Sequence, residues 1–289
     1  MEKHRNILVP YDFTPEAECA LKHAVCIAEM GKGTVHMVHI LDKKSQSKLK
    51  SNHKSEEDLR KDLARIAAEH CTENAQVLDL VKEGDIFHDI SNAASELGAD
   101  LIIFGTHGVR GMQHILGAFA LKLVTSATLP VIIVQRRPIR ANGYKKIVYP
   151  VDENPYSKQK AYAVADFAAE HNAEILLFPK KNHDEHFQNY TNGNLRYSEK
   201  VFEENGIPFT ISENNKSGSF DRQVIEFAAA HDADLISIIT QDSDDMDLGD
   251  IFVGSEDVHI INNDAEIPTL CINAVVSMKV GGLSGVTGT

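Results

Sequence analysis

Short apolar runs alternate with longer segments of helical periodicity in the first half of the chain. The apolar runs, each of strand length, lie at residues 6–9, 34–40, 76–81, 101–105 and 131–135, and the helical patterns lie at 14–31, 55–73, 86–97 and 112–127. Strands that alternate with helices in this way form a mostly parallel, doubly wound sheet with right-handed crossovers. The pattern therefore predicts an α/β fold of the Rossmann-like class.

The second half of the chain repeats the pattern of the first. Residues 7–12 recur as residues 147–152, and further strand runs lie at 174–178, 208–212, 235–239 and 269–272. A repeat of roughly 135–140 residues matches the size of a whole domain rather than the unit of a solenoid. We expect two tandem domains, at residues 1–138 and 144–276, each with a five-stranded, mostly parallel sheet of its own. The joint would fall within 136–143, and a disordered tail would follow at 277–289.

A glycine-rich loop after the fourth strand run carries most of the candidate chemistry. Gly105, Gly108 and Gly111 follow an apolar run, and a helical pattern begins at Met112. Glycine lets the backbone approach a ligand, and the unpaired N–H groups at the start of a helix favour an anion. The loop is therefore a candidate phosphate site, although a glycine-rich turn with a purely structural role fits the same residues.

Composition narrows the choice of partners. The 289 residues are 43% hydrophobic and 25% charged, and the formal net charge is −13. An acidic surface repels the phosphate backbone, so we do not expect nucleic acid as a partner. The N-terminal sequence shows no secretory hydrophobic region and no apolar run reaches the length of a membrane helix, so we expect a cytoplasmic protein without a membrane partner. The four cysteines lack C-x-x-C spacing, which favours reduced thiols.

Three short motifs carry a resemblance to a known family. They are Pro10-Tyr11-Asp12 after the first strand, Val38-His39-Ile40 at the end of the second, and Gly105-Thr106-His107-Gly108 followed by Gly117. In these motifs the chain resembles the universal stress protein family, strongly in its first half and weakly in its second. The resemblance implies strand order 3-2-1-4-5 and, in one branch of the family, ATP held in the cleft, with or without Mg²⁺.

The resemblance also implies which residues would contact the nucleotide. Asp12 would lie on the ribose or adenine side, the backbone near Ile40 would meet adenine, and amides of the loop and the following helix would hold the phosphates. The full set of implied contacts is Pro10, Tyr11, Asp12, Ile40, Gly105, His107, Gly108, Gly117, Ala118 and Phe119.

The phosphate loop departs from the family pattern at two points. The family spaces its glycines as G-x2-G-x9-G followed by Ser or Thr, whereas eight residues separate Gly108 from Gly117 here and Ala118 replaces the hydroxyl. Loss of one neutral hydrogen bond costs about 0.5–1.5 kcal/mol, which weakens a site without abolishing it. His107, with Arg110 and His114, either restores positive charge at the loop or is simply solvated.

The second half replaces the glycine loop with acidic residues. Five aspartates lie where the phosphates would be, at positions 242, 244, 245, 247 and 250. Several carboxylates close to a triphosphate would offset the free energy of binding, so we expect a single competent nucleotide cleft, in the first domain. Asp152 keeps the strand-end position. This half could therefore bind an uncharged or cationic ligand, and the alternative is a solvated acidic loop.

Three further features have open interpretations. Asp12 either contacts the ligand or caps the helix that begins near Thr14, and we favour the ligand role because Thr14-Pro15 already provides a cap and a first-turn proline. His183 and His186 could share a helix face and bind a transition metal, but we expect no metal site because no third ligand is evident. The segment 43–54 lacks apolar periodicity and predicts an exposed connection, either a cover for the site or a solvated linker.

Two classes of function follow from these observations. The first is an ATP-binding stress-response regulator whose state is read by an unknown protein partner. The second is a nucleotide-free structural or interaction protein in which the second domain serves dimerisation or partner docking. The two domains would form a pseudo-dimer within one chain, with a homodimer as the alternative. No catalytic motif marks an enzyme, and slow ATP hydrolysis is the most that we expect.

Overall fold

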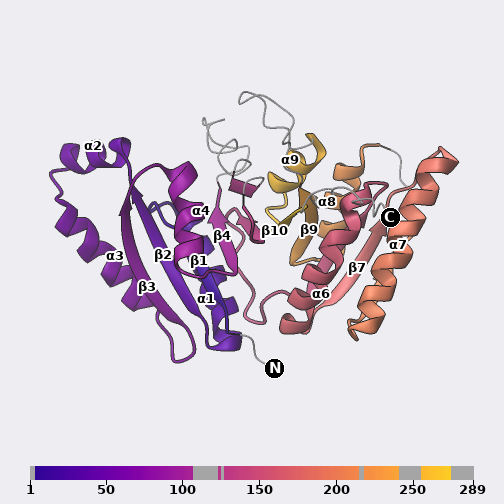
Figure 1. The fold of residues 1–289 in the computed structure, drawn as a ribbon, viewed down its shortest axis with the longest axis horizontal. Helices are drawn as coiled ribbons and strands as arrows, with labels where there is room; N and C mark the ends of the chain where they lie inside the picture. The colour runs from indigo at the N-terminus through magenta and orange to yellow at the C-terminus, as the bar shows by residue number, and fades with distance from the viewer. Residues whose placement is uncertain (1–3, 107–122, 125–126, 215–217, 241–254, 275–289) are drawn as a thin grey trace, which may run out of the picture.

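The computed structural model describes residues 4–106, 123–124, 127–214, 218–240 and 255–274 (Figure 1). The first half contains β1 (Asn6–Pro10), α1 (Pro15–Gly31), β2 (Thr34–Leu41), α2 (Lys43–Ser51), α3 (Glu56–His70), β3 (Gln76–Glu83), α4 (Ile86–Glu96), β4 (Leu101–Gly105) and β5 (Val131–Val134). The second half contains β6 (Lys146–Val151), η2 (Pro155–Gln159), α6 (Lys160–His171), β7 (Glu174–Pro179), α7 (Glu185–Glu204), β8 (Phe209–Ile211), α8 (Phe220–Ala230), β9 (Leu235–Thr240), α9 (Ser255–Ile261) and β10 (Thr269–Asn273). Most of the helix expected at 112–127, and the whole tail expected at 277–289, lie outside the described residues.

The strands form one sheet of ten rather than two sheets of five. Their order is β3-β2-β1-β4-β5-β10-β9-β6-β7-β8. Each half therefore has the expected order 3-2-1-4-5, and neighbouring strands within a half are parallel. The expectation of two separate sheets is wrong because β5 and β10 pair antiparallel in the middle. The two halves therefore lie side by side (Figure 1).

The pairing of β5 with β10 covers two apolar strand edges. Leu270 lies opposite Ile132, and all four residues of β5 are buried. An apolar strand with an unpaired edge is a template for aggregation, so a strand of this composition needs a partner. The sequence pattern shows that β5 is buried, but it does not say which strand covers its edge.

Helices cover both faces of the sheet. On one face, α1, α3, α6 and α7 bury apolar residues such as Leu21, Leu63 and Val164 against the strands. On the other face, α4, α8 and α9 do the same with residues such as Ile90 and Val224. Alternate residues of each strand point to opposite faces, so Ile7 belongs to the first layer and Leu8 to the second.

The segment expected to be an exposed connection at 43–54 instead begins with the helix α2. Asp42 and Ser45 start this helix by a reciprocal arrangement, in which Ser45 N donates to Asp42 Oδ1 and Asp42 N donates to Ser45 Oγ. Leu49 packs against the core as its single apolar anchor. Most described residues of this segment are exposed, as expected. The helix itself was not predicted, because Lys, Gln and Leu are good helix formers and capping with one anchor can replace a full apolar stripe.

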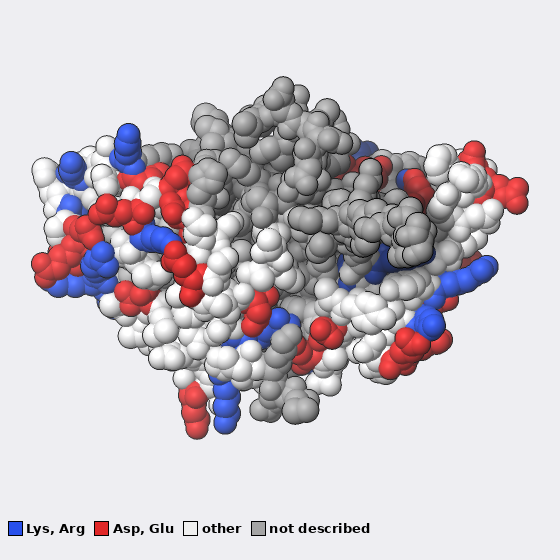
Figure 2. All heavy atoms as spheres, in the orientation of Figure 1, with Lys and Arg blue, Asp and Glu red and all other residues white. Residues whose placement is uncertain are grey.

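The surface of the first half carries charges of both signs. On α3, ion pairs with i, i+4 spacing join Arg60 to Glu56 and Arg65 to Glu69, and Figure 2 shows blue and red side chains interspersed at this end of the molecule. Such exposed pairs contribute little to stability but favour a solvated helix face. Among the described residues, no helix has the length and apolar character needed to cross a membrane.

Candidate functional site

The turn after β1 holds Asp12 in an exposed position at the carboxyl end of the sheet. Tyr11 N donates to Val38 O over 2.9 Å, which extends the β1–β2 pairing by one residue. Asp12 Oδ1 then accepts hydrogen bonds from the backbone N of Thr14, at 3.1 Å, and from its hydroxyl. The same hydroxyl accepts from Ala17 N and begins α1, so Thr14 is the N-cap, as the sequence predicts. Asp12 orients that cap while its carboxylate remains exposed.

Phe13 adds an exposed aromatic ring beside this carboxylate. It has a left-handed backbone conformation, with a φ of 65°, which is costly for a bulky residue and is often found at functional turns. Phe13 is 42% exposed, and its ring meets Tyr11 edge-on at 5.4 Å and lies 5.5 Å from the His39 ring, both between centroids. Phe13 was not predicted as a site residue. An aromatic residue inside an otherwise polar turn is the sequence feature that could have indicated it.

The end of β2 supports the same turn from the neighbouring strand. The His39 ring is buried, and its Nδ1 donates to Tyr11 O at 2.7 Å, because a carbonyl oxygen can only accept. Ile40 is also buried, and its carbonyl accepts from the Ser45 hydroxyl at 3.3 Å. A base that approached the backbone of Ile40 would therefore meet one acceptor that α2 already engages.

Gly105 ends β4, on the other side of β1. A Cβ atom at this position would lie 2.3 Å from Glu16 O, in the first turn of α1. The next amide, of Thr106, donates to Val134 O at 2.8 Å. Close packing against α1 thus explains why this residue is glycine, and a phosphate contact stays a prediction. His107, Gly108, Gly117, Ala118 and Phe119 lie outside the described residues.

The structure thus brings the described members of the predicted site to one end of the sheet. Pro10, Tyr11 and Asp12 follow β1, Ile40 is on β2, and Gly105 ends β4. Because β2 and β4 flank β1 on opposite sides, this is the point at which strand order reverses, where doubly wound sheets bind ligands. The geometry is compatible with a ligand that lies over the end of β1.

The side chain of Tyr11 points away from this edge. Its hydroxyl donates to Glu18 Oε2 at 3.0 Å, and Glu18 Oε1 lies 3.1 Å from Nε2 of His70 on α3. Burial, together with Glu18, raises the pKa of the Tyr11 phenol. Glu18 therefore joins the Tyr11 side chain to α3, and the contribution of Tyr11 to a ligand would come from its backbone.

The second half has a different set of side chains at the corresponding strand ends. Asp152 Oδ1 accepts from Asn154 N at 3.1 Å, which repeats the backbone bond of the turn in the first half, and it also accepts from the Ser157 hydroxyl, which lies three residues further on. Beyond it, Lys180 Nζ lies 2.9 Å from Glu153 Oε1. Both halves therefore have a turn held by an aspartate, but the charged side chains around that turn differ.

A buried lysine distinguishes this second cleft, and the sequence analysis did not single it out. Lys160 Nζ donates to Pro150 O at 2.7 Å and to Ser237 O at 3.3 Å, and burial lowers its pKa to about 8. Burial and the nearby carboxylate of Asp152 raise the pKa of Asp257 to about 7. The first half has the apolar Ala20 at the position of Lys160, counted from the shared aspartate. The two clefts therefore differ in chemistry.

The two histidines considered as metal ligands do not share a helix face. Asp184 is the N-cap of α7, so His183 precedes the helix, whereas the ring of His186 packs edge-on against Tyr190. In the described part of the chain, no three or more His, Cys, Asp or Glu side chains form a group that could hold a metal ion.

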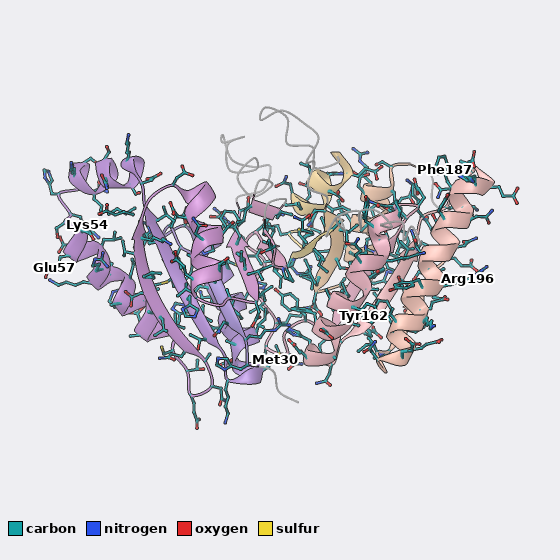
Figure 3. The ribbon with its side chains drawn as sticks, in the orientation of Figure 1. Met30, Lys54, Glu57, Tyr162, Phe187 and Arg196 are labelled. Atoms are coloured by element: carbon teal, nitrogen blue, oxygen red, sulfur yellow. The ribbon has the colours of Figure 1, made fainter. Side chains whose placement is uncertain are left out.

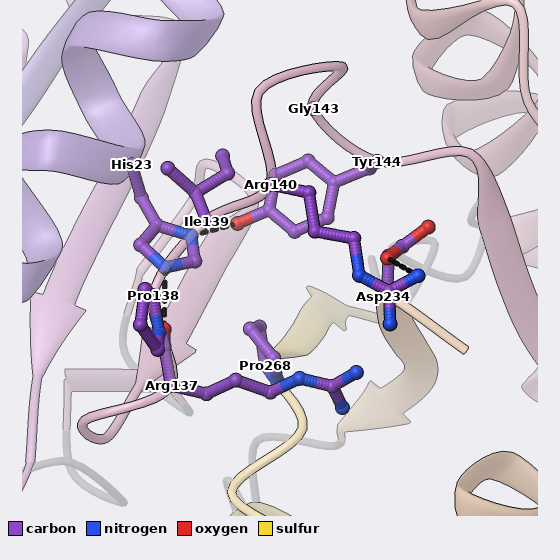
Figure 4. A pocket seen from close by; sticks show the side chains of 9 residues that line it. All are labelled: His23, Arg137, Pro138, Ile139, Arg140, Gly143, Tyr144, Asp234 and Pro268. Carbon is purple, nitrogen blue, oxygen red and sulfur yellow. Dashed lines mark hydrogen bonds and ion pairs between the residues drawn. The ribbon is translucent and has the colours of Figure 1, made fainter. Parts of the chain in front are cut away.

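A small pocket lies at the joint of the two halves (Figure 4). His23 on α1 is buried there, with Nδ1 2.6 Å from the Tyr144 hydroxyl and Nε2 3.0 Å from Arg137 O. On the other side of the pocket, Arg140 Nη1 lies 3.1 Å from Asp234 Oδ1. Its polar groups pair with one another, so the pocket is better suited to joining the halves than to holding a ligand.

Comparison with known proteins gives the family of the first half. Residues 3–135 match the family model of the universal stress protein family. The first half of the chain belongs to the universal stress protein family. Universal stress protein MJ0577 of Methanocaldococcus jannaschii is 27% identical over 156 residues, which cover 46% of this chain and 96% of that protein. Universal stress protein G of Escherichia coli is 25% identical over 145 residues, covering 46% and 99%.

A solved structure extends the likeness of fold to the whole chain. The universal stress protein of Archaeoglobus fulgidus matches with a TM-score of 0.68 at 16% identity and covers 93% of this chain and 98% of its own. At that identity the match shows the fold alone. The fold of nearly the whole chain, and not of one half alone, therefore has a counterpart among solved structures.

Proposed function

We propose that this universal stress protein binds ATP or a related adenine nucleotide in the cleft of its first half, as a stress-response regulator. The observation that carries the proposal is the exposed Asp12 carboxylate at the strand-order reversal. A carboxylate accepts hydrogen bonds from ribose hydroxyls, and the neighbouring Phe13 ring offers an apolar face to a base or sugar. Mg²⁺ would accompany the phosphates, and an unidentified protein partner would respond to the bound state.

The second half is proposed to bind no nucleotide. Its corresponding cleft contains Glu153 and Asp257 near Asp152. Carboxylates close to a triphosphate oppose binding, and the single buried ammonium of Lys160 is already bonded to two carbonyl groups. One nucleotide per chain is the expected stoichiometry.

The alternative is a nucleotide-free interaction protein. Two contacts favour it, because each gives a structural reason for a residue of the predicted site. Gly105 is required by the packing of α1, and the Ile40 carbonyl is engaged by Ser45.

The Asp12→Asn substitution tests the proposal. Asparagine keeps a side-chain oxygen that can accept the two Thr14 hydrogen bonds, so the turn survives while the negative charge is lost. We expect ATP affinity to fall by about tenfold or more, the cost of a charge-assisted hydrogen bond, with little change in melting temperature. Isothermal titration calorimetry measures the affinity and the stoichiometry.

Asp152→Asn is the matched control, because Asp152 makes the same turn in the other half. It should leave ATP affinity unchanged. Absence of ATP binding to the wild-type chain would exclude the proposal and leave the interaction protein. Equal losses in both variants would place a nucleotide in each half.

A further inference from the structure

His171, the last residue of α6, has no hydrogen-bond partner for either ring nitrogen among the described residues, although its side chain is fully buried. The ring stacks on Phe167 at 4.2 Å between centroids and meets Tyr144 edge-on. A buried polar group without a partner is costly, and such a group in a native structure calls for an explanation. Burial, with Lys145 and Arg5 nearby, lowers the pKa of the imidazole to about 3, so the ring is neutral and keeps a lone pair.

Two sulfur-bearing side chains of the other half and a ring nitrogen of His171 surround one point next to Gly143. A Cβ atom built on Gly143 would lie 3.3 Å from His171 Nδ1, 3.6 Å from Met30 Cε and 3.9 Å from Cys26 Sγ. Cys26 and Met30 are one turn apart on α1, and Figure 3 labels Met30 in the lower middle of the view, between the lower ends of α1 and α6. The imidazole of His171, the thiol of Cys26 and the methyl end of the Met30 thioether thus border one small space next to the α-carbon of Gly143.

Gly143 keeps this space open. Its φ of +69° is a conformation that side chains with a Cβ rarely adopt, and the absent Cβ is what leaves room between the three side chains. Cys26 and Met30 are partly exposed, so two of the three side chains lie near the surface.

We propose that Cys26, Met30 and His171 form a binding site for a soft monovalent cation, Cu(I), between the two halves. Thiolate, thioether and imidazole are the ligand types that favour Cu(I), and three ligands are sufficient for it. Carboxylate or water ligands, which Mg²⁺ or Ca²⁺ would require, do not belong to this trio.

The local charge selects a monovalent ion over Zn²⁺. Lys145 lies close by, since its ammonium donates to His171 O, and Arg5 is near enough to act on the same ring. A divalent ion with one thiolate would leave a net positive charge in a buried site beside these cations. Cu(I) with one thiolate is neutral, which keeps the cost of burial low.

Binding exchanges one proton for one metal ion. The Cys26 S–H bond breaks, the proton leaves to solvent and an S–Cu bond forms, with no change in oxidation state. Because this proton is released, the affinity for the metal ion should weaken as the pH falls.

Anaerobic titration with Cu(I), against the chromophoric competitor bicinchoninate and without nucleotide, tests the site. The wild-type chain should bind one Cu(I). Cys26→Ser should lower the affinity more than about a hundredfold through loss of the thiolate, and Met30→Leu by about tenfold. Cys19→Ser, on the same helix, and Cys71→Ser, at an exposed cysteine, are the matched controls and should bind like the wild type.

A second measurement follows His171 without replacing it. Copper(I) is diamagnetic, so the ring nitrogen resonances of ¹⁵N-histidine-labelled protein can be compared with and without the metal. One imidazole nitrogen of His171 should shift on addition of one equivalent. Wild-type affinity in Cys26→Ser, loss of binding in Cys71→Ser, no binding by the wild type, or an unmoved His171 would each overturn the proposal. The site uses no residue of the nucleotide cleft, so these outcomes are independent of ATP binding.

Discussion

At the end of β4, the α-carbon of Gly105 lies so close to the first turn of α1 that a Cβ atom would come within 2.3 Å of Glu16 O and 2.7 Å of Ala17 N. Both atoms belong to the backbone and cannot rotate away. A Cβ atom added to Gly193, in the middle of α7, would have open space around it, with nothing within 4 Å. The two glycines therefore have opposite consequences when a methyl group is added.

Gly105→Ala should destabilise the protein by about 1–3 kcal/mol, because α1 must shift to make room. Gly193→Ala should stabilise it by about 0.5–1 kcal/mol, since alanine restricts the unfolded chain and favours a helix. Urea denaturation gives both free energies of unfolding. A Gly105→Ala protein as stable as the wild type would mean that α1 does not pack against β4 as closely as described.

Sequence patterns predicted where Asp12 and Gly105 lie in the fold, but not which residues they contact. Asp12 and Gly105 are expected at strand ends and are found there, because apolar runs and glycines mark where strands stop. The contact of Gly105 with α1 was not predictable, since it depends on how closely a helix approaches a strand. Phe13 and Lys160 were missed for the same reason. The exposure of an aromatic residue in a turn and the burial of a lysine in a helix both depend on tertiary contacts.

At the scale of elements, α1 is anchored to the segment that joins the halves. Arg137 O can only accept, so His23 donates from Nε2, and Nδ1 must accept from the Tyr144 hydroxyl. This tautomer is neutral. Burial lowers the pKa of His23 to about 4, and the charge of Arg137 contributes to the same shift.

Stability should therefore fall as the pH is lowered from about 6.5 to 4. The unfolded chain binds a proton at His23 near pH 6.5, whereas the folded protein resists it until about pH 4, so protonation favours unfolding across this window. The contribution of His23 is on the order of 2–3 kcal/mol, and His171 acts in the same direction.

His23→Gln separates this effect from other acid effects. Glutamine can donate to Arg137 O and accept from Tyr144 without titrating, so the variant should lose less stability between pH 6.5 and 4 than the wild type. Free energies of unfolding at several pH values measure the difference, and His4→Gln, at an exposed position, is the control. An identical pH profile in His23→Gln would show that the buried tautomer does not control acid stability.

Element boundaries differ from the sequence prediction where capping outweighs apolar periodicity. The limits of α1 and β4 agree closely with the apolar pattern, because both bury a continuous apolar face. Most residues of α2 are polar. The helix depends on the hydrogen bonds of Asp42 and Ser45 at its start and on Leu49, which packs against the core. Such a helix has no repeating apolar positions from which it could be predicted.

For the whole molecule, the joint between the halves contains both apolar and polar contacts. The β5–β10 pairing is continued by Gln135 Nε2, which donates to Asn263 O at 2.9 Å, and by Asn273 Nδ2, which donates to Ala127 O at 3.3 Å. Repeat patterns predicted the two halves but not their fusion into one sheet. Strand pairing across the joint depends on contacts between residues far apart in sequence, which a pattern along the chain does not contain.

Arg5 provides the charged part of the joint. Its guanidinium donates to both oxygens of Glu170 on α6, at 2.9 and 3.0 Å, and to Asp100 Oδ1 at 2.8 Å. It therefore links the start of β1 to the second half through a two-point contact with a carboxylate, which fixes geometry as well as charge. Its side chain is buried, so the pairs are less screened than those on the surface.

Replacement of Arg5 by methionine should therefore weaken both halves together. The change leaves Glu170 and Asp100 without their cation, and partial exposure of these carboxylates limits the cost to about 1–3 kcal/mol. Arg60→Met, which breaks the exposed pair with Glu56, should cost less than about 0.5 kcal/mol. Hydrogen exchange with mass spectrometry, read on peptides from β1 and from α6, should show both losing protection to the same extent in Arg5→Met. Loss confined to β1 would mean that the halves unfold independently, and that the continuous sheet does not make the molecule one cooperative unit.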